Sequence, residues 1–350
     1  MPRWLLLAVV ICLFQLLLFV LLRSYIWLSG HKPRWYAVVL LFGLGNSLFG
    51  ARWFLPHGII VFANVLALSW LWFLVALPIG LLHLLGHGRH DKYLKPLLPT
   101  AFLALLGFAW FSAHSPTILR YQIQLNKPLA PLKIALVTDT HFGLWVGKGM
   151  AEKLVAMLNA EQVDMVLMPG DIINDNPDYY DRDGIAQILK RIQAPVYATL
   201  GNHEFYGDTA GNDRALREAG MHVLRDETAI FNNQIAIIGR DDDYARARPS
   251  LPELLAQVDQ QMPVFVLDHR PTNIEEAATL PIDMQVSGHS HRGQIFPANF
   301  ITSSMYVLDH GHAEIGGVHF FTSSGFGYWG TPLRLGSRSE LMIIEVSGKE

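Results

Sequence analysis

The sequence is short of cysteine throughout and of acidic residues in its first third. Cys12 is the only cysteine among the 350 residues, which excludes an intramolecular disulfide and leaves the redox compartment open. Residues 1–115 contain eight Lys or Arg residues but a single acidic residue, Asp91. Charged residues form only 16% of the chain and hydrophobic residues 51%, an apolar excess that is not typical of an ordinary soluble protein.

The apolar excess is concentrated in four long runs near the N-terminus, each long enough to cross a bilayer as a helix. No A-x-A-like cleavage site follows the first run before Pro33, so we interpret it as an anchor and not as a signal peptide. None of the runs contains an acidic residue, which argues against an ion-coupled transporter. We predict a transmembrane helical region over residues 1–115, with spans near 4–22, 36–54, 59–85 and 97–113.

The basic residues of the loops predict how these helices are oriented. Six of the eight Lys or Arg residues in this region lie in the 23–35 and 86–96 loops. The positive-inside rule places such loops in the cytoplasm. With four spans, the N-terminus and the part of the chain after the last span then lie outside the cytoplasm. We expect an integral, multi-pass protein of the inner or plasma membrane whose soluble domain is extracytoplasmic.

The rest of the chain has the opposite character, with 19 basic and 29 acidic residues over 116–350. Residues 116–132 contain three prolines and are interpreted as a linker with a short strand at 121–125. From residue 133 onward, short apolar strands alternate with helices, which predicts α/β layering. Further strands follow near the C-terminus, so the domain over 133–350 is expected to contain two sheets.

Polar residues that can bind metal follow five of these predicted strands. Ligands of α/β folds bind at the carboxyl ends of strands, so these residues are expected to meet at one edge. A single cluster is also explained by a loop polar residue or a helix N-cap, but five clusters at five strand ends favour a metal site. They are TDTH with Asp139 and His141, GDIIND with Asp171, GNHE with Asn202 and His203, DHRP with His269, and GHSH with His289 and His291.

The ordered set of D-x-H, G-D-x-x-N, G-N-H-E, a single His and G-H-x-H resembles the calcineurin-like metallophosphoesterases over roughly 133–345. The stretch SGHSHRGQIFP is most similar to the membrane-associated, transmembrane branch with G-H-x-H-G-G-Q, although Arg292 replaces the first of those glycines. The resemblance implies a four-layer α/β/β/α sandwich with a dinuclear metal site at its edge, behind an N-terminal all-α transmembrane bundle of about four helices.

The resemblance also implies a role for each residue of the five clusters. Asp171 matches the ligand that bridges two divalent metal ions. Asp139, His141 and His291 would complete one ion's site, and Asn202, His269 and His289 the other. The mixed oxygen and nitrogen ligands suit Mn, Fe or Zn without choosing among them. His203 would contact the phosphate or protonate the leaving oxygen, the alternative being a structural role.

Other residues are open to two interpretations. Arg246 and Arg248, in the RDDDYARAR stretch, either meet the phosphate of the substrate or belong to a solvated charged loop. The H-x-H pair at His310 and His312 is interpreted as part of a solvent-facing strand, not as a third metal pair. Three aromatic residues just beyond ligand clusters either touch the membrane or pack within their loops: Trp145, Phe205 and Tyr206.

Together these features predict a membrane-embedded, metal-dependent phosphoric ester hydrolase. It would hydrolyse a phosphomonoester, phosphodiester or pyrophosphate, on a membrane-borne or lipid-linked substrate. Its partners would be the lipid bilayer and that substrate, with no nucleic acid, and the oligomeric state stays open. One alternative is a cytoplasm-facing pyrophosphatase of the UDP-diacylglucosamine type, which the predicted topology disfavours. Another is a non-catalytic membrane-anchored interaction module on the same fold, although such a module is expected to lack ligands and all seven are present here.

Overall fold

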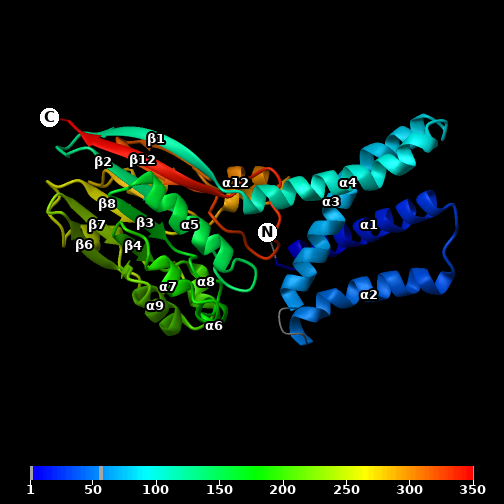
Figure 1. The fold of residues 1–350 in the computed structure, drawn as a ribbon, viewed down its shortest axis with the longest axis horizontal. Helices are drawn as coiled ribbons and strands as arrows, with labels where there is room; N and C mark the ends of the chain where they lie inside the picture. Colours follow the sequence, from blue (N-terminus) through cyan, green and yellow to red (C-terminus); the bar gives the residue numbers. More distant parts are fainter. Residues whose placement is uncertain (1–2, 55–57, 350) are drawn as a thin grey trace. The chain divides into compact units, whose positions relative to one another are not determined.

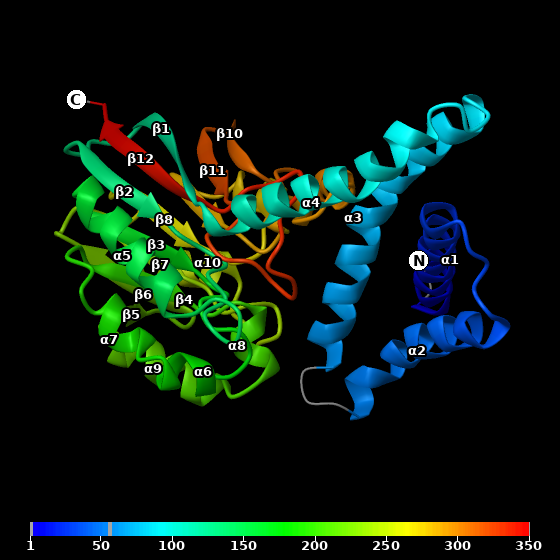
Figure 2. The same cartoon turned by 45° about the vertical axis from the view of Figure 1, so that its right-hand side comes forward.

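The computed structural model describes residues 3–54 and 58–349, and the chain divides into two compact units (Figures 1 and 2). The first unit is Met1–Phe111 and the second is Ser112–Glu350.

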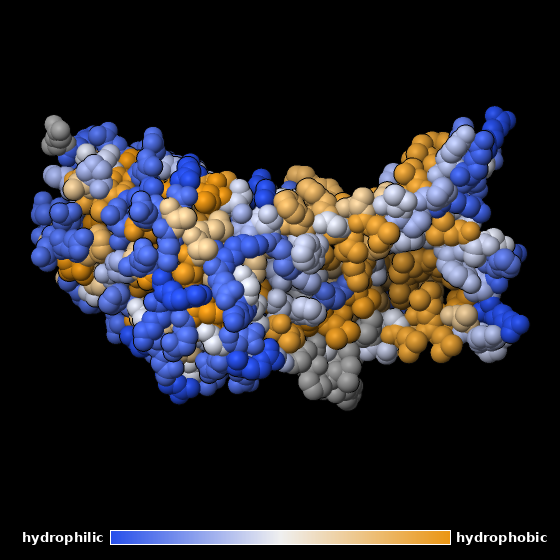
Figure 3. Space-filling view, in the orientation of Figure 1, coloured by the Kyte–Doolittle hydropathy of each residue, from blue (hydrophilic) through white to orange (hydrophobic). Residues whose placement is uncertain are grey.

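The first unit consists of helices α1 (Arg3–Ser29), α2 (Trp35–Phe54), α3 (Gly58–Leu85) and the greater part of α4 (Asp91–His114). Among the described residues, α1, α3 and α4 are long and apolar enough to cross a membrane, and α2 contributes a shorter apolar helix, Trp35–Ser47. Figure 3 shows hydrophobic residues over the middle of the helices and hydrophilic residues at the ends of the α1–α2 and α3–α4 hairpins. This pattern is the one that a bilayer requires of helices that span it.

The second unit is built on two six-stranded sheets. The first sheet has the order β1 (Thr117–Leu125), β12 (Glu340–Gly348), β2 (Leu132–Leu136), β3 (Met165–Pro169), β4 (Val196–Thr199) and β5 (His222–Val223). The second has the order β10 (Gly311–Ile315), β11 (Val318–Thr322), β9 (Met284–Ser287), β8 (Val264–Leu267), β7 (Ile235–Gly239) and β6 (Glu227–Phe231).

Helices cover the outer face of each sheet, which gives the predicted four layers. One apolar cluster fills the space between the sheets, where Leu136 and Leu167 of the first contact residues such as Phe265 of the second. Helices α5 (Lys148–Glu161), α7 (Ile185–Leu189) and α9 (Thr209–Glu218) pack on the first sheet. Helices α10 (Leu251–Leu255) and α11 (Ile274–Ala277) pack on the second. Because both faces are covered, central strands such as β3 are buried along their whole length.

The structure differs from the predicted linker over 116–132. Residues 117–125 form β1, which pairs in parallel with β12 from Thr117↔Glu340 to Leu125↔Gly348. The side chains of Ile123 and Leu125 are buried in the cluster between the sheets, so this segment contributes to the core. The strand lies at the edge of its sheet, which is why its apolar pattern is weaker than that of the central strands. Helix α4 therefore leads directly into the sandwich.

Candidate metal centre

The metal-binding residues that the sequence predicts lie together where strands of both sheets end. Strands β2, β3 and β4 run parallel to one another, as do β7, β8 and β9, so their carboxyl ends share one edge. Potential ligand atoms lie within 4.8 Å of one another in three overlapping groups. The groups are Asp139 with His141 and His291, Asp171 with His269 and His289, and His141 with Asp171 and His203.

The ring nitrogens of His141 and His291 face each other at one end of the centre. Their Nε2 atoms are 3.0 Å apart. Two imidazole nitrogens that bind one cation at about 2.1 Å and at right angles to each other are also about 3.0 Å apart. Asp139 Oδ1 is 3.4 Å from the Nε2 atom of His291 and 3.9 Å from that of His141. These three side chains are arranged to hold one ion.

Asp171 lies between this group and a second one. Its Oδ2 atom is 3.8 Å from His141 Nε2 and 3.1 Å from His269 Nε2. His269 Nε2 is in turn 3.2 Å from Asn202 Oδ1, and the ring of His289 lies 5.1 Å from that of His269. One carboxylate oxygen thus borders both groups, which is the position required of a bridging ligand.

Burial keeps most histidines of the centre uncharged, which is the form that binds a cation. It lowers the pKa of His141 and the pKa of His289 to about 3, and together with the repulsion that two protonated rings would feel at His141 and His291 it holds the pKa of His291 well below its usual range. His269 differs, since burial lowers its pKa but the adjacent Asp171 carboxylate raises it to about 10. A cation bound at His269 would take the place of a proton.

The two buried carboxylates form no direct ion pair with a Lys or Arg side chain among the described residues. In the part of the chain that the structure describes, the ion-pair partners of Asp139 and Asp171 are histidines and not Lys or Arg, although the charge of Arg334 also acts on Asp139 from beyond ion-pair distance. Burial raises the pKa of Asp139 to about 6. It acts the same way on Asp171, but the positive charge of His269 outweighs it and holds the pKa of Asp171 well below its usual range. Buried carboxylates are costly without a cation, and carboxylate, amide and imidazole donors suit divalent metals. The residues therefore fit a metal.

The backbone at the ligands is held in conformations that side chains normally avoid. Five of the seven predicted ligands have positive φ angles between 47° and 67°: Asp139, His141, Asp171, His289 and His291. Such strain is typical of functional sites, where the surrounding structure imposes it. The motif glycines leave the necessary space, since a Cβ on Gly201 would collide with Asp171 Oδ1 and one on Gly288 with Asp139 Oδ2.

The sequence of the chain is related to known proteins in the same region. The profile of the family described as calcineurin-like phosphoesterase matches residues 132–293. An uncharacterized metallophosphoesterase of Helicobacter pylori strain J99 is 33% identical over 270 residues, which cover 74% of this chain and 72% of the relative.

The chain belongs to the calcineurin-like phosphoesterase family.

Other relatives extend this relationship. An uncharacterized metallophosphoesterase of Aquifex aeolicus is 30% identical over 71% of this chain and 99% of the relative. A transmembrane protein with metallophosphoesterase domain of Danio rerio is 27% identical over 73% of this chain and 63% of the relative. The phosphoesterase is thus a metal-dependent phosphoric ester hydrolase with N-terminal membrane helices, and its cluster of Asp and His residues is able to bind metal ions.

His203 is fixed next to the predicted metal ligands of the phosphoesterase by Asp175, a carboxylate to which the motif pattern assigned no role. Its Nδ1 atom is 2.7 Å from Asp175 Oδ1, and its ring is 4.7 Å from that of His141. Burial lowers the pKa of His203, but the hydrogen bond with Asp175 and the charge of Asp171 outweigh burial and raise it. Asp175 belongs to the GDIIND motif, so its position four residues after Asp171 was the available signal.

Glu204 is a second residue whose role the sequence left open. It is fully buried in α8 (Asn202–Tyr206) and accepts four backbone hydrogen bonds. Its Oε1 atom accepts from Ile172 and Ile173 at 2.7 Å, and its Oε2 atom accepts from Gly201 at 2.8 Å and Asp171 at 3.0 Å. Glu204 thereby ties the loop that carries Asp171 to the loop that carries Asn202.

We expect Glu204→Gln to lower the free energy of unfolding by about 2–5 kcal/mol, because the new NH₂ group would face two buried N–H donors and leave them unsatisfied. Denaturant unfolding of the purified protein measures this change. Glu218→Gln, at an exposed position of α9, is the matched control and should leave the midpoint unchanged. Equal midpoints for both variants would show that Glu204 does not join the two loops.

Arg334 is a buried cation that lies outside all of the sequence motifs. Its side chain is fully buried, and burial lowers its pKa to about 10. Nη2 donates to the carbonyl oxygens of Ser324 at 2.6 Å and Gly327 at 2.7 Å, and it lies 3.2 Å from His291 Nδ1. The Gly327 N–H in turn donates to the Asp139 carbonyl at 2.9 Å. Arg334 thus holds the 324–327 loop against the first metal group.

The other residues that the sequence left open to two interpretations do not all lie at the metal centre. Arg248 forms ion pairs with Asp243 and with Asp268, whose Oδ1 atom is 2.6 Å from Arg248 Nη2. Arg248 therefore stabilises the strand end before His269. Arg246 is exposed, and substrate contact stays a prediction for it.

His310 Nε2 is 3.0 Å from Glu340, whereas His312 Nε2 is 3.1 Å from His319 Nδ1, so the two histidines contact different partners. Trp145 and Tyr206 are exposed, but Phe205 packs against the core.

Proposed function

We propose that the chain is a dinuclear phosphoesterase that hydrolyses the phosphate of a membrane-borne, lipid-linked substrate on the extracytoplasmic side. The observation that carries the substrate proposal is a short path of contacts, all within the second unit, from the end of α4 to the metal centre.

This path begins at His114, the last residue of a candidate membrane span. His114 Nε2 is 3.0 Å from the hydroxyl oxygen of Tyr328, and that hydroxyl donates to the Trp145 carbonyl at 2.9 Å. The next residue, Trp329, places its ring 6.0 Å from the ring of His203. Two consecutive aromatic residues therefore separate the end of the span from the metal centre, which supports a reaction close to the bilayer surface.

Aromatic side chains lie next to two histidines of the centre, and two of them, Trp329 and Tyr206, are exposed. The rings of Trp329 and Tyr206 flank His203, and the ring of Tyr306 lies 6.5 Å from that of His289. Tyr306 directly follows α12 (Ala298–Met305), a helix with no buried residue. Phe300 and Met305 on this helix are 63% and 65% exposed. An apolar rim next to a phosphate-hydrolysing centre supports a substrate that carries an acyl or prenyl chain.

The residues of the centre supply the rest of the chemistry. A pair of divalent cations, when bound, lowers the pKa of water to give a nucleophile and offsets the charge of the phosphate. One cation would be held by Asp139, His141 and His291. The other would be held by Asn202, His269 and His289, and Asp171 would bind both cations. His203, whose orientation Asp175 fixes through Nδ1, is placed to hold a phosphate oxygen or to give a proton to the leaving oxygen.

Contacts within the first unit support the proposed orientation. Trp27 near the end of α1 donates to Asp91 Oδ2 at 3.0 Å, and His83 near the end of α3 is 2.6 Å from Asp91 Oδ1. Helices α1 and α3 therefore point the same way, so the segment that contains α2 returns across the unit between them. The shared end carries the basic 23–35 and 86–96 loops, which favours the cytoplasm for that end and the opposite side for His114.

A reporter protein fused after Glu350 tests which side of the membrane the phosphoesterase domain faces. Alkaline phosphatase, which works only outside the cytoplasm, should be active there, and a fluorescent protein that folds only in the cytoplasm should stay dark. The reverse pattern would refute the orientation and favour a cytoplasm-facing nucleotide-lipid pyrophosphatase.

Hydrolysis by the purified protein in detergent tests the substrate class. We expect lipid phosphates and lipid-linked pyrophosphates to be cleaved with a kcat/KM roughly tenfold or more above that of their water-soluble headgroups, because each 1.4 kcal/mol of acyl-chain contact gives a factor of ten. We propose that Mn restores the activity that chelation removes. Fe and Zn are the alternative metals to be added in parallel. Equal rates for lipid and headgroup would remove the case for a lipid-linked substrate and leave the metal chemistry intact.

A further inference from the structure

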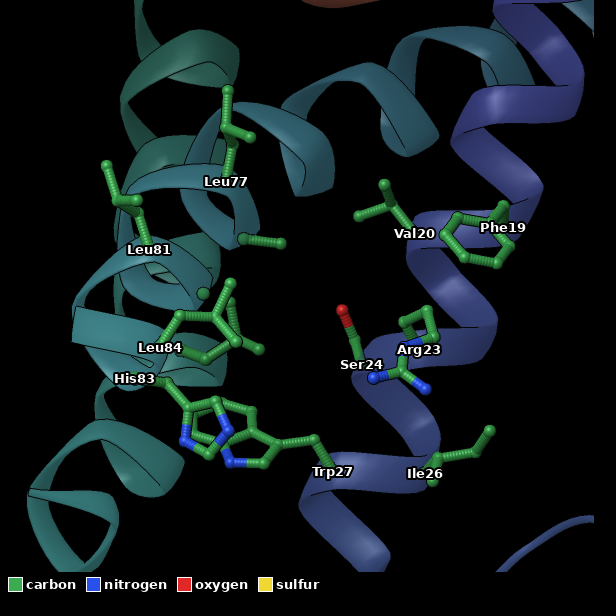
Figure 4. Close-up of a pocket in the computed structure, with 13 residues that line it drawn as sticks. Phe19, Val20, Arg23, Ser24, Ile26, Trp27, Leu77, Leu81, His83 and Leu84 are labelled. Atoms are coloured by element: carbon green, nitrogen blue, oxygen red, sulfur yellow. The ribbon is translucent and has the colours of Figure 1, made fainter. Parts of the chain in front are cut away.

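The helices of the first unit line a partly open pocket that has no part in the metal centre. It has a volume of about 460 Å³ and lies between α1 and α3, with one residue of α4 (Figure 4). Small-molecule sites have volumes in this range. Figure 4 shows Phe19, Val20 and Arg23 of α1 on one side, and Leu77 and Leu81 of α3 on the other. The walls are apolar and partly open, since Phe19, Leu77 and Leu81 are exposed at the surface of the unit.

Polar side chains close one end of this pocket and leave one cation free. Both oxygens of Asp91 are occupied, Oδ1 by His83 Nδ1 at 2.6 Å and Oδ2 by Trp27 Nε1 at 3.0 Å. Ser24 Oγ accepts from Trp72 Nε1 at 3.1 Å. Arg23 lines the same end, and across residues 3–54 and 58–349 it forms no ion pair with a carboxylate. The pocket thus joins a hydrocarbon-like wall to an unneutralised guanidinium.

We propose that this pocket binds one molecule of an anionic phospholipid, with an acyl chain between α1 and α3 and the headgroup phosphate at Arg23. The charge of the site favours this occupant, because the 23–35 and 86–96 loops add five Lys or Arg residues to Arg23 at the same end of the unit. Basic residues at a membrane surface attract anionic lipid, and a guanidinium pairs with phosphate through two hydrogen bonds. A second copy of the chain fits less well, since a two-fold contact would bring the same basic ends together.

Two glycines provide a matched pair of variants for the test. A Cβ on Gly80, which lines the pocket in α3, would meet no atom within 4 Å. Gly80→Leu therefore fills the pocket without a backbone collision. A Cβ on Gly107 in α4 also meets nothing within 4 Å, but Gly107 lies outside the pocket. Gly107→Leu is the control for adding the same side chain to a membrane helix, and Arg23→Gln removes the charge alone.

Native mass spectrometry measures the lipid that stays bound to the full chain after its release from nanodiscs. The metal is chelated beforehand so that no lipid is hydrolysed. The probes are phosphatidylglycerol and phosphatidylcholine with identical acyl chains. The wild type and Gly107→Leu should each retain one phosphatidylglycerol, and Gly80→Leu and Arg23→Gln should retain it at least tenfold less often.

Three outcomes would overturn the proposal. The first is equal retention of phosphatidylglycerol by Gly80→Leu and Gly107→Leu. The second is retention of phosphatidylcholine by the wild type as often as phosphatidylglycerol, which would remove the headgroup contact. The third is a shift from dimer to monomer in Gly80→Leu with lipid unchanged, which would assign the pocket to a second copy of the chain. None of these readouts depends on phosphoesterase activity.

Discussion

Replacing Asp171 by Ala should remove metal from both halves of the centre and abolish most of the activity. Asp171 Oδ2 is 3.8 Å from the ring nitrogen of His141 and 3.1 Å from that of His269, so one side chain borders both groups of potential ligands. Metal ions contribute several kcal/mol to the stabilisation of charge in the transition state. Their loss corresponds to a fall in kcat of roughly 10³- to 10⁴-fold. Kinetics together with metal analysis of the purified variant measure both effects.

A carboxylate at the other end of the same strand is the control for this experiment. Asp164 immediately precedes β3, and its Oδ2 atom accepts a hydrogen bond from the Lys133 N–H at 2.7 Å. Asp164→Asn should keep the metal content and the kcat of the wild type. If Asp171→Ala still carried two metal ions per chain, Asp171 would not be the bridging ligand.

His203→Ala should separate catalysis from metal binding. The imidazole is oriented by Asp175 at 2.7 Å and is not one of the seven predicted ligands, so its removal leaves those seven residues in place. We expect two metal ions per chain and a kcat that is lower by roughly 10²- to 10⁴-fold, the range for a lost acid–base or charge-stabilising group. Asp175→Asn should give a smaller loss, because the amide oxygen still accepts from Nδ1 but carries no charge.

His222 offers a control for this histidine substitution. It is exposed on β5 and stacks on Tyr197 with 5.0 Å between ring centroids, away from the ligand groups. His222→Ala should leave kcat unchanged. A His203→Ala protein that loses metal in proportion to its activity would place His203 among the metal-holding residues instead.

The strand-end positions of the ligands follow from the sequence for a general reason. A buried parallel strand is a local apolar run, and the polar residue after it must lie at the carboxyl edge of the sheet. This rule brings Asp139, Asp171 and His269 together although more than 100 residues separate the first from the last. The membrane helices follow from length and composition in the same way.

Residues whose role depends on distant partners do not follow from such patterns. Arg334 looks like an ordinary charged residue until the fold wraps the 324–327 carbonyls around its guanidinium. Strand β1 is an edge strand with a weak apolar pattern, and its partner β12 lies more than 200 residues further along the chain. Glu204 stands next to His203 in the GNHE motif, yet only the structure shows that it accepts three hydrogen bonds from backbone N–H groups of the 171–173 loop and a fourth from Gly201 of its own motif.

The most direct test of the central claim is a titration of metal into the purified, metal-free chain, with bound metal per chain and phosphoester hydrolysis measured on the same samples. Two groups of ligands share Asp171, so hydrolysis should be absent without metal and should rise until two divalent ions are bound per chain. Asp164→Asn should follow the same curve, and Asp171→Ala should stay at the baseline. Full hydrolysis by the metal-free chain, or saturation at a single ion, would contradict the dinuclear centre proposed for these residues.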